Sequence, residues 1–300
     1  MNNILYKNII VDSSSELVPQ IRISPFSLQV ASEESDVYNV TPLLSIKDKH
    51  ISYHLKGRYA LSAALSDLNL ESTDSVTILT TSGNYYVSGC VTRTIESVCT
   101  WDREISENTK AILVIHEFGY PYKNIENLKK HNVPIIEDCA YAFINDPQMG
   151  QIGDYVIYSL PKSFNMQIGG LLYSKSLISD SVTSEQRAYV DNHLNSYLSY
   201  IELYRSKRLK NFVYLKEKLN DIDIVPYFSD NDNIPGVFLF SWRDDVDYPD
   251  LKKFMQQNGV ESSVFYGQNA FFIPIHQNLS DKELDYMINL LKYYYEFNVI

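Results

Sequence analysis

The sequence predicts an α/β protein with a mainly parallel central sheet. Three short apolar segments, residues 133–136, 156–159 and 170–173, have the length of buried strands, and polar residues stand at their ends. Further strand-like and helix-like segments alternate upstream of them, and such alternation favours parallel pairing with right-handed crossovers. Because ligands bind beyond the carboxyl ends of strands in these sheets, the polar residues there are the first candidates for a site.

Composition narrows the class of protein. The chain has 300 residues, of which 45% are hydrophobic, enough for one large domain or for a large and a small one. A net charge of −11 without a basic block argues against a nucleic-acid partner. No apolar run reaches the roughly 18 residues of a membrane span, and the N-terminus lacks the basic region of a signal peptide. Three cysteines without C-x-x-C spacing indicate neither a zinc site nor disulfides, so a cytoplasmic location is expected.

The first half of the chain supplies most of the predicted sheet. Apolar residues at positions 60, 61, 64, 65 and 68 have helical spacing, and Gly57 stands where the chain would turn into that helix. A helix N-terminus of this kind is able to bind an anion, although most glycines before helices only form turns. The remaining segments predicted here are strands over 4–11, 76–79 and 111–116 and helices over 87–96 and 125–130.

The second half predicts a smaller α/β region. One long helix is expected over 197–219, followed by strands over 236–242 and 260–266 with a helix over 248–257 between them. Asn258-Gly259 would end that helix, and Ser280 with Glu283 forms a capping box for a last helix. We therefore expect an N-terminal segment over 1–50, a large domain over 51–190, and a linking helix with a small domain over 191–300.

Asp138 and Lys162 follow two of the predicted strands, and their residue types allow two interpretations. In the first, Asp138 caps a local turn or helix and Lys162 is a solvated loop residue. In the second, the pair serves pyridoxal phosphate, a cofactor that needs a lysine amine for covalent attachment and an acid against its ring nitrogen. The cofactor also needs hydroxyl and backbone N–H groups for its phosphate. His116, alone after a strand, is interpreted as structural, and no metal site is expected.

Motifs at these positions resemble a known family. The sequences Ile135–Ala140, Ser159–Lys162 and Gly169-Gly170, together with Val114–Gly119 and the C-terminal Ile275–Leu291, are similar to those of the DegT/DnrJ/StrS family of sugar aminotransferases. These are pyridoxal-phosphate enzymes of fold type I. The resemblance implies a large cofactor-binding domain with a mainly parallel sheet, a small C-terminal α/β domain and a homodimer.

The resemblance also implies roles for individual residues. Lys162 would be the catalytic residue that holds the cofactor and later moves a proton. Asp138 would pair with the ring nitrogen, Ala140 would lie against the ring, and Ser159 would bind the phosphate. Tyr141 stands where the family generally has Gln or His in contact with the ring's 3-hydroxyl group.

Two further groups of candidates come from the region before residue 90. By resemblance, the turn that opens the predicted helix binds the cofactor phosphate, with Gly57, Arg58 and Tyr59 as candidates. The family places an aromatic ring on the cofactor just after the strand over 76–79. Tyr85 is the predicted residue, while Asn84 and Tyr86 remain open as alternatives, as does a purely structural role for these tyrosines.

The implied reaction is amino transfer, with glutamate as the expected donor and a keto group on a nucleotide-linked sugar as acceptor. Lys162 argues against the family's dehydratase branch, in which a histidine takes its place. The chain differs from the family in its N-terminal arm, at Tyr141 and in a connection of only four residues, Gly267–Ala270. These differences keep two alternatives open: an aminotransferase for a smaller keto compound, and a non-catalytic protein of the same fold that serves as a binding or assembly partner.

Overall fold

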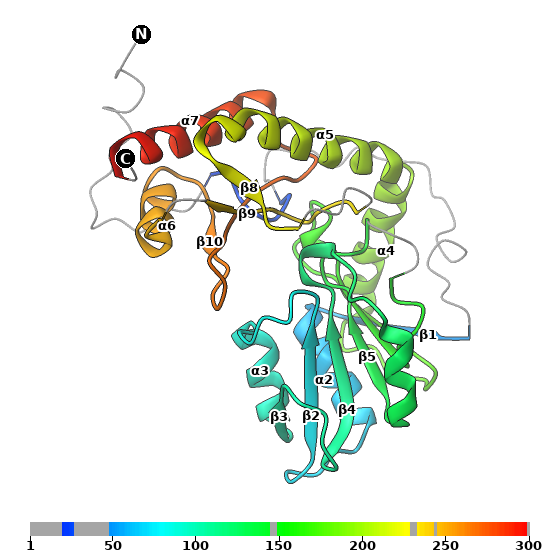
Figure 1. Cartoon of the computed structure of the whole chain (residues 1–300). Helices are drawn as coiled ribbons and strands as arrows, with labels where there is room; N and C mark the ends of the chain where they lie inside the picture. The colour runs from blue at the N-terminus through cyan, green and yellow to red at the C-terminus, as the bar shows by residue number, and fades with distance from the viewer. Residues whose placement is uncertain (1–19, 27–47, 145–148, 229–232, 243–244, 299–300) are drawn as a thin grey trace. The chain divides into compact units, whose positions relative to one another are not determined.

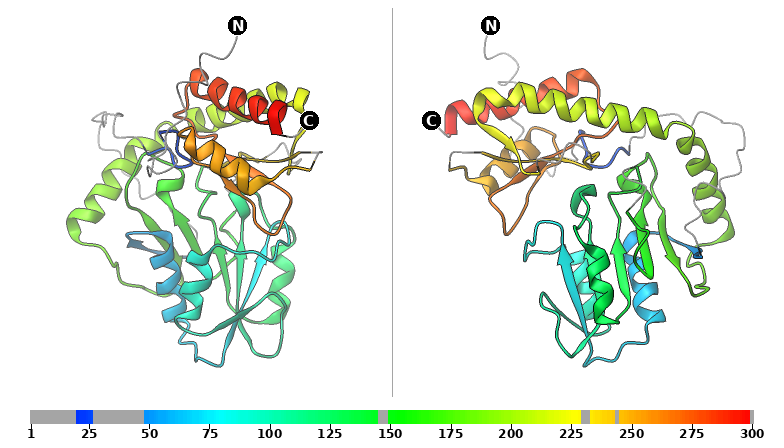
Figure 2. Two further views of the ribbon diagram at one scale, coloured as in Figure 1. Left: turned by 90° about the vertical axis from the view of Figure 1, so that its left-hand side faces the viewer. Right: turned by 45° about the vertical axis from the view of Figure 1, so that its right-hand side comes forward.

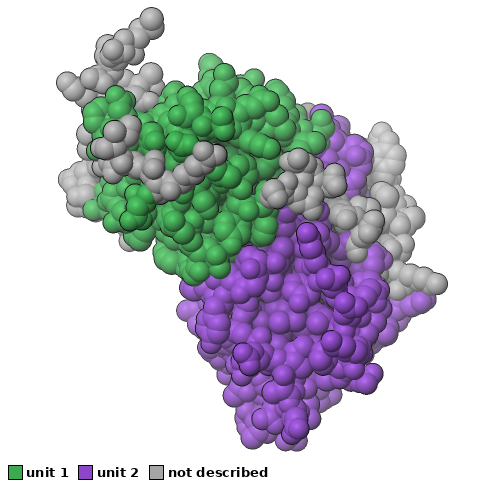
Figure 3. All heavy atoms as spheres, viewed as in Figure 1, with its two compact units in different colours: residues 1–25, 206–231, 235–300 green, residues 26–205, 232–234 purple. Residues whose placement is uncertain are grey.

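The computed structural model describes residues 20–26, 48–144, 149–228, 233–242 and 245–298. The strand predicted over 4–11 and most of the N-terminal segment therefore lie outside the described residues. The chain divides into two compact units (Figure 3): one comprises residues 26–205 and 232–234, and the other residues 1–25, 206–231 and 235–300. The division falls inside one helix, at residues 205–206, whereas the predicted large domain ends at 190.

The unit of residues 26–205 contains a seven-stranded sheet in the order β1-β7-β6-β5-β4-β2-β3 (Figure 1). Its central strands β2 to β6 are all parallel, and β7 runs antiparallel to both of its neighbours, β6 and β1. The prediction of a mainly parallel sheet is thus confirmed. The strands are β1 His50–His54, β2 Ser75–Thr80, β3 Thr100–Asp102, β4 Thr109–Ile115, β5 Ile135–Asp138, β6 Tyr155–Ser159 and β7 Gly170–Ser174.

Helices cover both faces of this sheet (Figure 2). α2 (Gly57–Asp67) and α3 (Gly89–Glu96) pack on one face, where Ala60, Leu65 and Ile95 join a core with inward residues of the strands. On the other face lie α4 (Ser184–Leu198), through Val190 and Leu194, and the 3₁₀ helix η2 (Ile125–His131), through Leu128. Successive side chains of a strand point to opposite faces of the sheet, so an even-numbered and an odd-numbered residue of one strand meet different helix layers.

Two predicted helices differ from the structure. The segment predicted as a helix over 125–130 is the 3₁₀ helix η2, which left-handed residues Asn124 and Asn132 confine at both ends. The helix predicted over 197–219 is α5 (Ile201–Leu219), which starts four residues later because α4 ends at Leu198 with Ser199 as its C-cap. The start of α4 has a sequence signal that the prediction missed, a capping box of Thr183 and Gln186.

The second unit has a four-stranded antiparallel sheet in the order β10-β11-β9-β8. Apolar residues of α5, α6 (Tyr248–Gln257) and α7 (Asp281–Asn298) pack against it in one core. Asn258 ends α6, and the Ser280–Glu283 capping box starts α7, as predicted. The strands are β8 Ile224–Pro226, β9 Phe238–Trp242, β10 Ser263–Val264 and β11 Phe271–Ile273.

The strand predicted over 260–266 is reduced to the two residues of β10. The chain turns back directly after it, and the amide of Phe265 donates to the carbonyl of Ala270. The short connection Gly267–Ala270 is therefore a tight hairpin between β10 and β11. None of the helices in the described part of the chain has the length and apolar character needed to cross a bilayer.

Candidate active site

The site begins where β5 and β6 end side by side. Asp138 is the last residue of β5 and Ser159 the last of β6, and Asp138 pairs with Ile157 in the parallel register. Asp138 lies two residues after Ile136, and Ser159 two residues after Ile157, so each points to the same face of the sheet as that isoleucine. Both isoleucines belong to the core under α2. The two polar residues therefore lie on the α2 face of the sheet, at its carboxyl edge.

The N-terminus of α2 meets this edge at very short distance. A Cβ atom built on Gly57 would lie 3.3 Å from Cβ of Ser159, and one built on Gly170 would lie 2.4 Å from the backbone of Lys56. The N-cap residue, Lys56, makes no side-chain cap hydrogen bond. The first amides of α2 thus lie beside the Ser159 hydroxyl with no capping side chain, an arrangement suited to an anion.

Asp138 also stabilises the turn that follows β5. Its Oδ1 accepts a hydrogen bond of 2.9 Å from the amide of Ala140, as in an Asx turn. The capping interpretation of Asp138 is therefore correct in part. A carboxylate has about four lone-pair positions, so this bond leaves Asp138 able to accept a further donor.

Lys162 lies at the end of the short 3₁₀ helix η3 (Leu160–Lys162) that follows β6. Leu160 is fully buried, its amide donates to the carbonyl of Gly169, and its own carbonyl accepts from Ser163 and Phe164. This anchoring fixes the backbone that carries the lysine. The Lys162 ammonium lies over the ring of Tyr141, 4.0 Å from the centroid. The amine and the residues after Asp138 are thus brought together by the fold.

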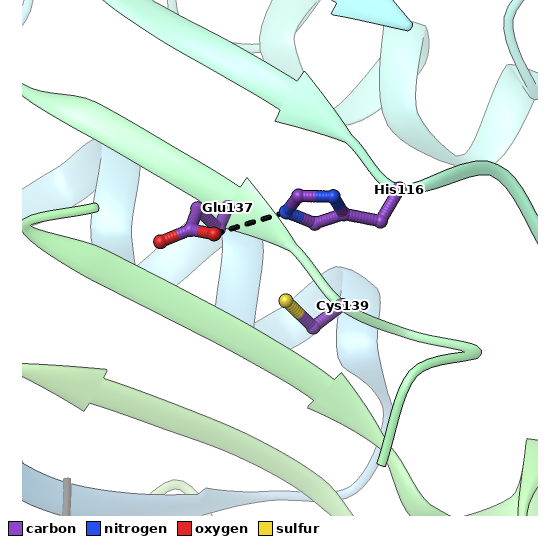
Figure 4. A group of neighbouring side chains, drawn as sticks. All are labelled: His116, Glu137 and Cys139. Carbon is purple, nitrogen blue, oxygen red and sulfur yellow. Dashed lines mark hydrogen bonds and ion pairs between the residues drawn. The ribbon is translucent and has the colours of Figure 1, made fainter. Parts of the chain in front are cut away.

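A buried hydrogen-bonded pair of side chains lies at the same strand ends (Figure 4). His116, just after β4, donates from Nε2 to Glu137 of β5 across 2.9 Å, and its Nδ1 accepts from the amide of Tyr122. Glu137 also accepts from the amides of Gly150, Ile152 and Gly153. Burial by itself would raise the pKa of Glu137, but the bonds from His116 and the backbone amides together lower it below its ordinary value.

Cys139 completes a buried group with this pair, and the ligand atoms of the three residues lie within 4.8 Å of one another. Burial raises the pKa of the Cys139 thiol well above its ordinary value. Both ring nitrogens of His116 are already engaged, and Glu137 accepts four donors. The geometry therefore describes a hydrogen-bonded support of the β5 end, in keeping with the structural interpretation of His116.

Three predicted residues lie in other surroundings. Arg58 and Tyr59 are exposed on the first turn of α2 and contact each other, with Nη2 of Arg58 donating to the Tyr59 hydroxyl at 3.3 Å. Tyr85 is 71% exposed and packs against Trp101 of the edge strand β3. Among the alternatives to Tyr85, Asn84 is buried and accepts from the amide of Tyr86 through Oδ1, a structural role.

Phe118 is a site residue that the sequence analysis did not select. It belongs to the short 3₁₀ segment η1 (Glu117–Gly119) after β4, and its ring centroid lies 5.5 Å from that of Tyr141. The available signal was an aromatic residue between a strand end and a glycine. Its relation to Tyr141 depends on two adjacent strands and could not be read from either segment alone.

The residues present fit pyridoxal phosphate by their chemistry. The α2 amides and Ser159 offer donors to a phosphate, Asp138 offers a carboxylate to a protonated ring nitrogen, and Lys162 offers an amine. Ala140, which is buried, keeps the side chain after Asp138 small. These groups surround one carboxyl edge of the sheet, where ligands of α/β folds bind.

Comparison with known proteins points to the same class of enzyme. Residues 45–233 match a protein family described as "Putative PLP-dependent aminotransferase". No curated protein matches the chain in sequence.

Solved structures have the same fold at low identity. The DegT DnrJ EryC1 StrS aminotransferase from Brucella abortus is 14% identical, with a TM-score of 0.65 over 85% of this chain and 88% of that one. An aminotransferase from Psychrobacter cryohalolentis is 14% identical, with a TM-score of 0.67 over 85% and 90%. The "Putative sugar aminotransferase Spr1654" from Streptococcus pneumoniae is 16% identical, with a TM-score of 0.64 over 82% and 86%.

The match covers more than half of the chain, and the fold is that of the DegT/DnrJ/EryC1/StrS aminotransferases, fold type I. This protein belongs to the family of PLP-dependent aminotransferases.

Proposed function

We propose that the protein transfers an amino group from glutamate to a keto group on a nucleotide-linked sugar, with Lys162 as the catalytic residue. The observation that carries this proposal is the placement of Lys162 at the sheet edge formed by Asp138 and Ser159. The sugar acceptor is supported by the similar fold of the S. pneumoniae protein, whose name describes a sugar aminotransferase. The proposed assembly is a cytoplasmic homodimer, in keeping with the family and with three free cysteines.

Each residue would have a distinct task. Bound pyridoxal phosphate supplies an aldehyde that takes up the amino group and an electron-poor ring that stabilises negative charge on the substrate carbon. Lys162 would attach the cofactor through Nζ and take the proton from the donor's Cα. Asp138 would keep the proton on the ring nitrogen. The N-terminal amides of α2 and the Ser159 hydroxyl would hold the phosphate.

The first experiment tests attachment at Lys162. The purified protein is incubated with pyridoxal phosphate, treated with borohydride and digested, and the modified peptide is identified by mass spectrometry. We expect the label on Lys162 and none on that peptide in Lys162→Ala. Label confined to other lysines, at saturating cofactor, would refute the assignment and leave the alternative of a non-catalytic protein.

A second candidate function follows from the hairpin between β10 and β11. Because Gly267–Ala270 forms a tight turn, the segment that is longer in the resembling family cannot contribute to an acceptor pocket here. A smaller keto compound is therefore the alternative acceptor. Parallel assays with glutamate and either nucleotide-linked keto sugars or short keto acids separate the two: turnover of keto acids alone would reject the sugar.

A further inference from the structure

The ammonium of Lys162 and the ring of Tyr141 form a close cation–π contact. The Nζ atom lies 4.0 Å from the ring centroid, well inside the limit of about 6 Å for such an interaction. Both side chains are half-buried, so the contact is partly shielded from water. A charged amine over a partly desolvated ring face gains more than the same contact on an open surface.

The ring of Tyr141 also contacts the ring of Phe118. The two ring centroids lie 5.5 Å apart with an interplanar angle of 52°. Phe118 has φ 53° and ψ 24°, a left-handed conformation that is unfavourable for a bulky residue. Such strain persists only where the surroundings enforce it, and it gathers at functional sites.

Hydrogen bonds on both sides of Phe118 enforce that conformation. Before it, Glu117 accepts from the amide of Ser82 through Oε2 at 2.6 Å, and its own amide donates to Oγ1 of Thr81. After it, Thr81 donates to the carbonyl of Tyr120 at 2.7 Å. The loop is thereby tied to the end of β2, and the Phe118 ring is held beside Tyr141.

From these contacts we propose that the ring face of Tyr141, supported by Phe118, is the docking place of the Lys162 ammonium whenever the amine is not attached to the cofactor. An aminotransferase releases its lysine in the first half-reaction and attaches it again only at the end of the second, so a fixed resting place shortens the search for the reactive position. Tyr141 is on this view a positioning residue. The purpose of this docking rests on the proposed function, whereas the contact between Lys162 and Tyr141 does not depend on it.

The proposal differs from the role that the family resemblance implies for this position. A side chain that contacts the ring's 3-hydroxyl group acts through a hydrogen bond, which in Tyr141 would come from the phenol hydroxyl. Docking of an ammonium uses the aromatic face and not the hydroxyl. Tyr141→Phe keeps the face and removes the hydroxyl, whereas Tyr141→Leu removes both, so the pair of variants separates the two roles.

The test measures how fast the Lys162 amine reacts in the full-length chain without cofactor. The protein is treated with limiting acetic anhydride at neutral pH, and acetylation of Lys162 is measured by mass spectrometry relative to Lys110, which is exposed on β4. We expect Tyr141→Leu to accelerate Lys162 acetylation about five- to tenfold and Tyr141→Phe to stay within about twofold of the wild type. Phe118→Leu should give an intermediate acceleration, because it loosens the ring without removing it.

Equal rates in wild type and Tyr141→Leu would overturn the proposal, and so would a Tyr141→Phe rate as high as that of Tyr141→Leu. If Tyr141→Leu does not fold, Tyr141→Gln takes its place under the same criteria. The comparison needs no bound cofactor. A chain that fails to take up pyridoxal phosphate would therefore refute the proposed function and still give a clear answer on the docking contact.

Discussion

The side chains of His116 and Glu137 form a buried pair in which Nε2 donates to the carboxylate across 2.9 Å. The tautomer follows from the second ring nitrogen, because Nδ1 accepts from the amide of Tyr122. Glu137 in turn accepts hydrogen bonds from the amides of residues 150, 152 and 153, which lie in the loop before β6. One carboxylate thus ties together the segments on both sides of the strand that ends at Asp138.

Replacing Glu137 with Gln should lower the free energy of unfolding by about 2–4 kcal/mol, because buried donors lose an anionic acceptor. The pKa of Glu137 is lower in the folded protein than the ordinary value of 4.5, so the unfolded chain binds this proton first as the pH falls. The stability gained from the carboxylate is therefore complete above about pH 4.5 and is lost below it. Urea unfolding at pH 7 and at pH 4 should show the difference between wild type and variant shrinking at the lower pH; a constant difference would contradict the assignment.

His276 should make the stability of the second unit, which contains β8 to β11, depend on pH over a different range. Burial, with a contribution from the nearby Arg208 charge, lowers the pKa of His276 from 6.5 to about 3. The folded protein keeps the His276 ring neutral, whereas the unfolded chain takes up a proton on it as the pH falls. The contribution of the neutral ring to the free energy of unfolding is therefore complete above pH 6.5 and is lost progressively down to about pH 3.

His276→Gln tests this pH dependence, because Gln does not titrate. It retains a donor for the carbonyl of Arg22, to which Nε2 of His276 donates at 3.0 Å. The unfolding free energy of the variant should fall less between pH 6.5 and 4 than that of the wild type. Fluorescence of buried Trp242 reports on this unit if Trp101 is first replaced by Phe. Parallel pH profiles in the two proteins would argue against a buried neutral histidine.

Gly57→Ala should weaken binding of pyridoxal phosphate about tenfold, because the added methyl group lies 3.3 Å from Ser159 and pushes the α2 amides away from its hydroxyl. The matched control is Gly89→Ala at the first position of α3, where the new Cβ meets only the flexible Arg93 side chain. Fluorescence titration with the cofactor gives both dissociation constants. Equal weakening in the two variants would show that the effect is not local to the phosphate site.

Asp138→Asn should reduce kcat by about 10²–10³-fold, since the amide no longer holds a proton on the ring nitrogen. The fold should remain intact, because an Asn oxygen can still accept from the Ala140 amide as Oδ1 of Asp138 does. Asp154→Asn is the control at the opposite end of the same sheet, where that carboxylate caps the amide of Ile135. Comparable losses of kcat in the two variants would remove the special role of Asp138.

Local patterns in the sequence were sufficient to predict the centre of the fold. Apolar segments of strand length ending at Asp138 and Ser159 predicted β5 and β6 to within about two residues, because burial of a parallel strand demands a short, continuously apolar run. Capping residues predicted the end of α6 and the start of α7, because a cap involves only residues a few positions apart in the chain. The 3₁₀ character of η2 and the break before α5 were not predicted, because periodicity alone does not resolve them.

The sequence by itself therefore determined the class of fold, the strand ends and the residue types offered to a cofactor. Only the tertiary structure decided which of these residues meet: Gly57 with Ser159, His116 with Glu137, and Tyr141 with both Phe118 and Lys162. It also placed Tyr85 against Trp101 at the sheet edge, a contact that the strand before it does not reveal. The physical reason is that strand order and facing are set by packing between segments distant in the chain, which local patterns do not encode.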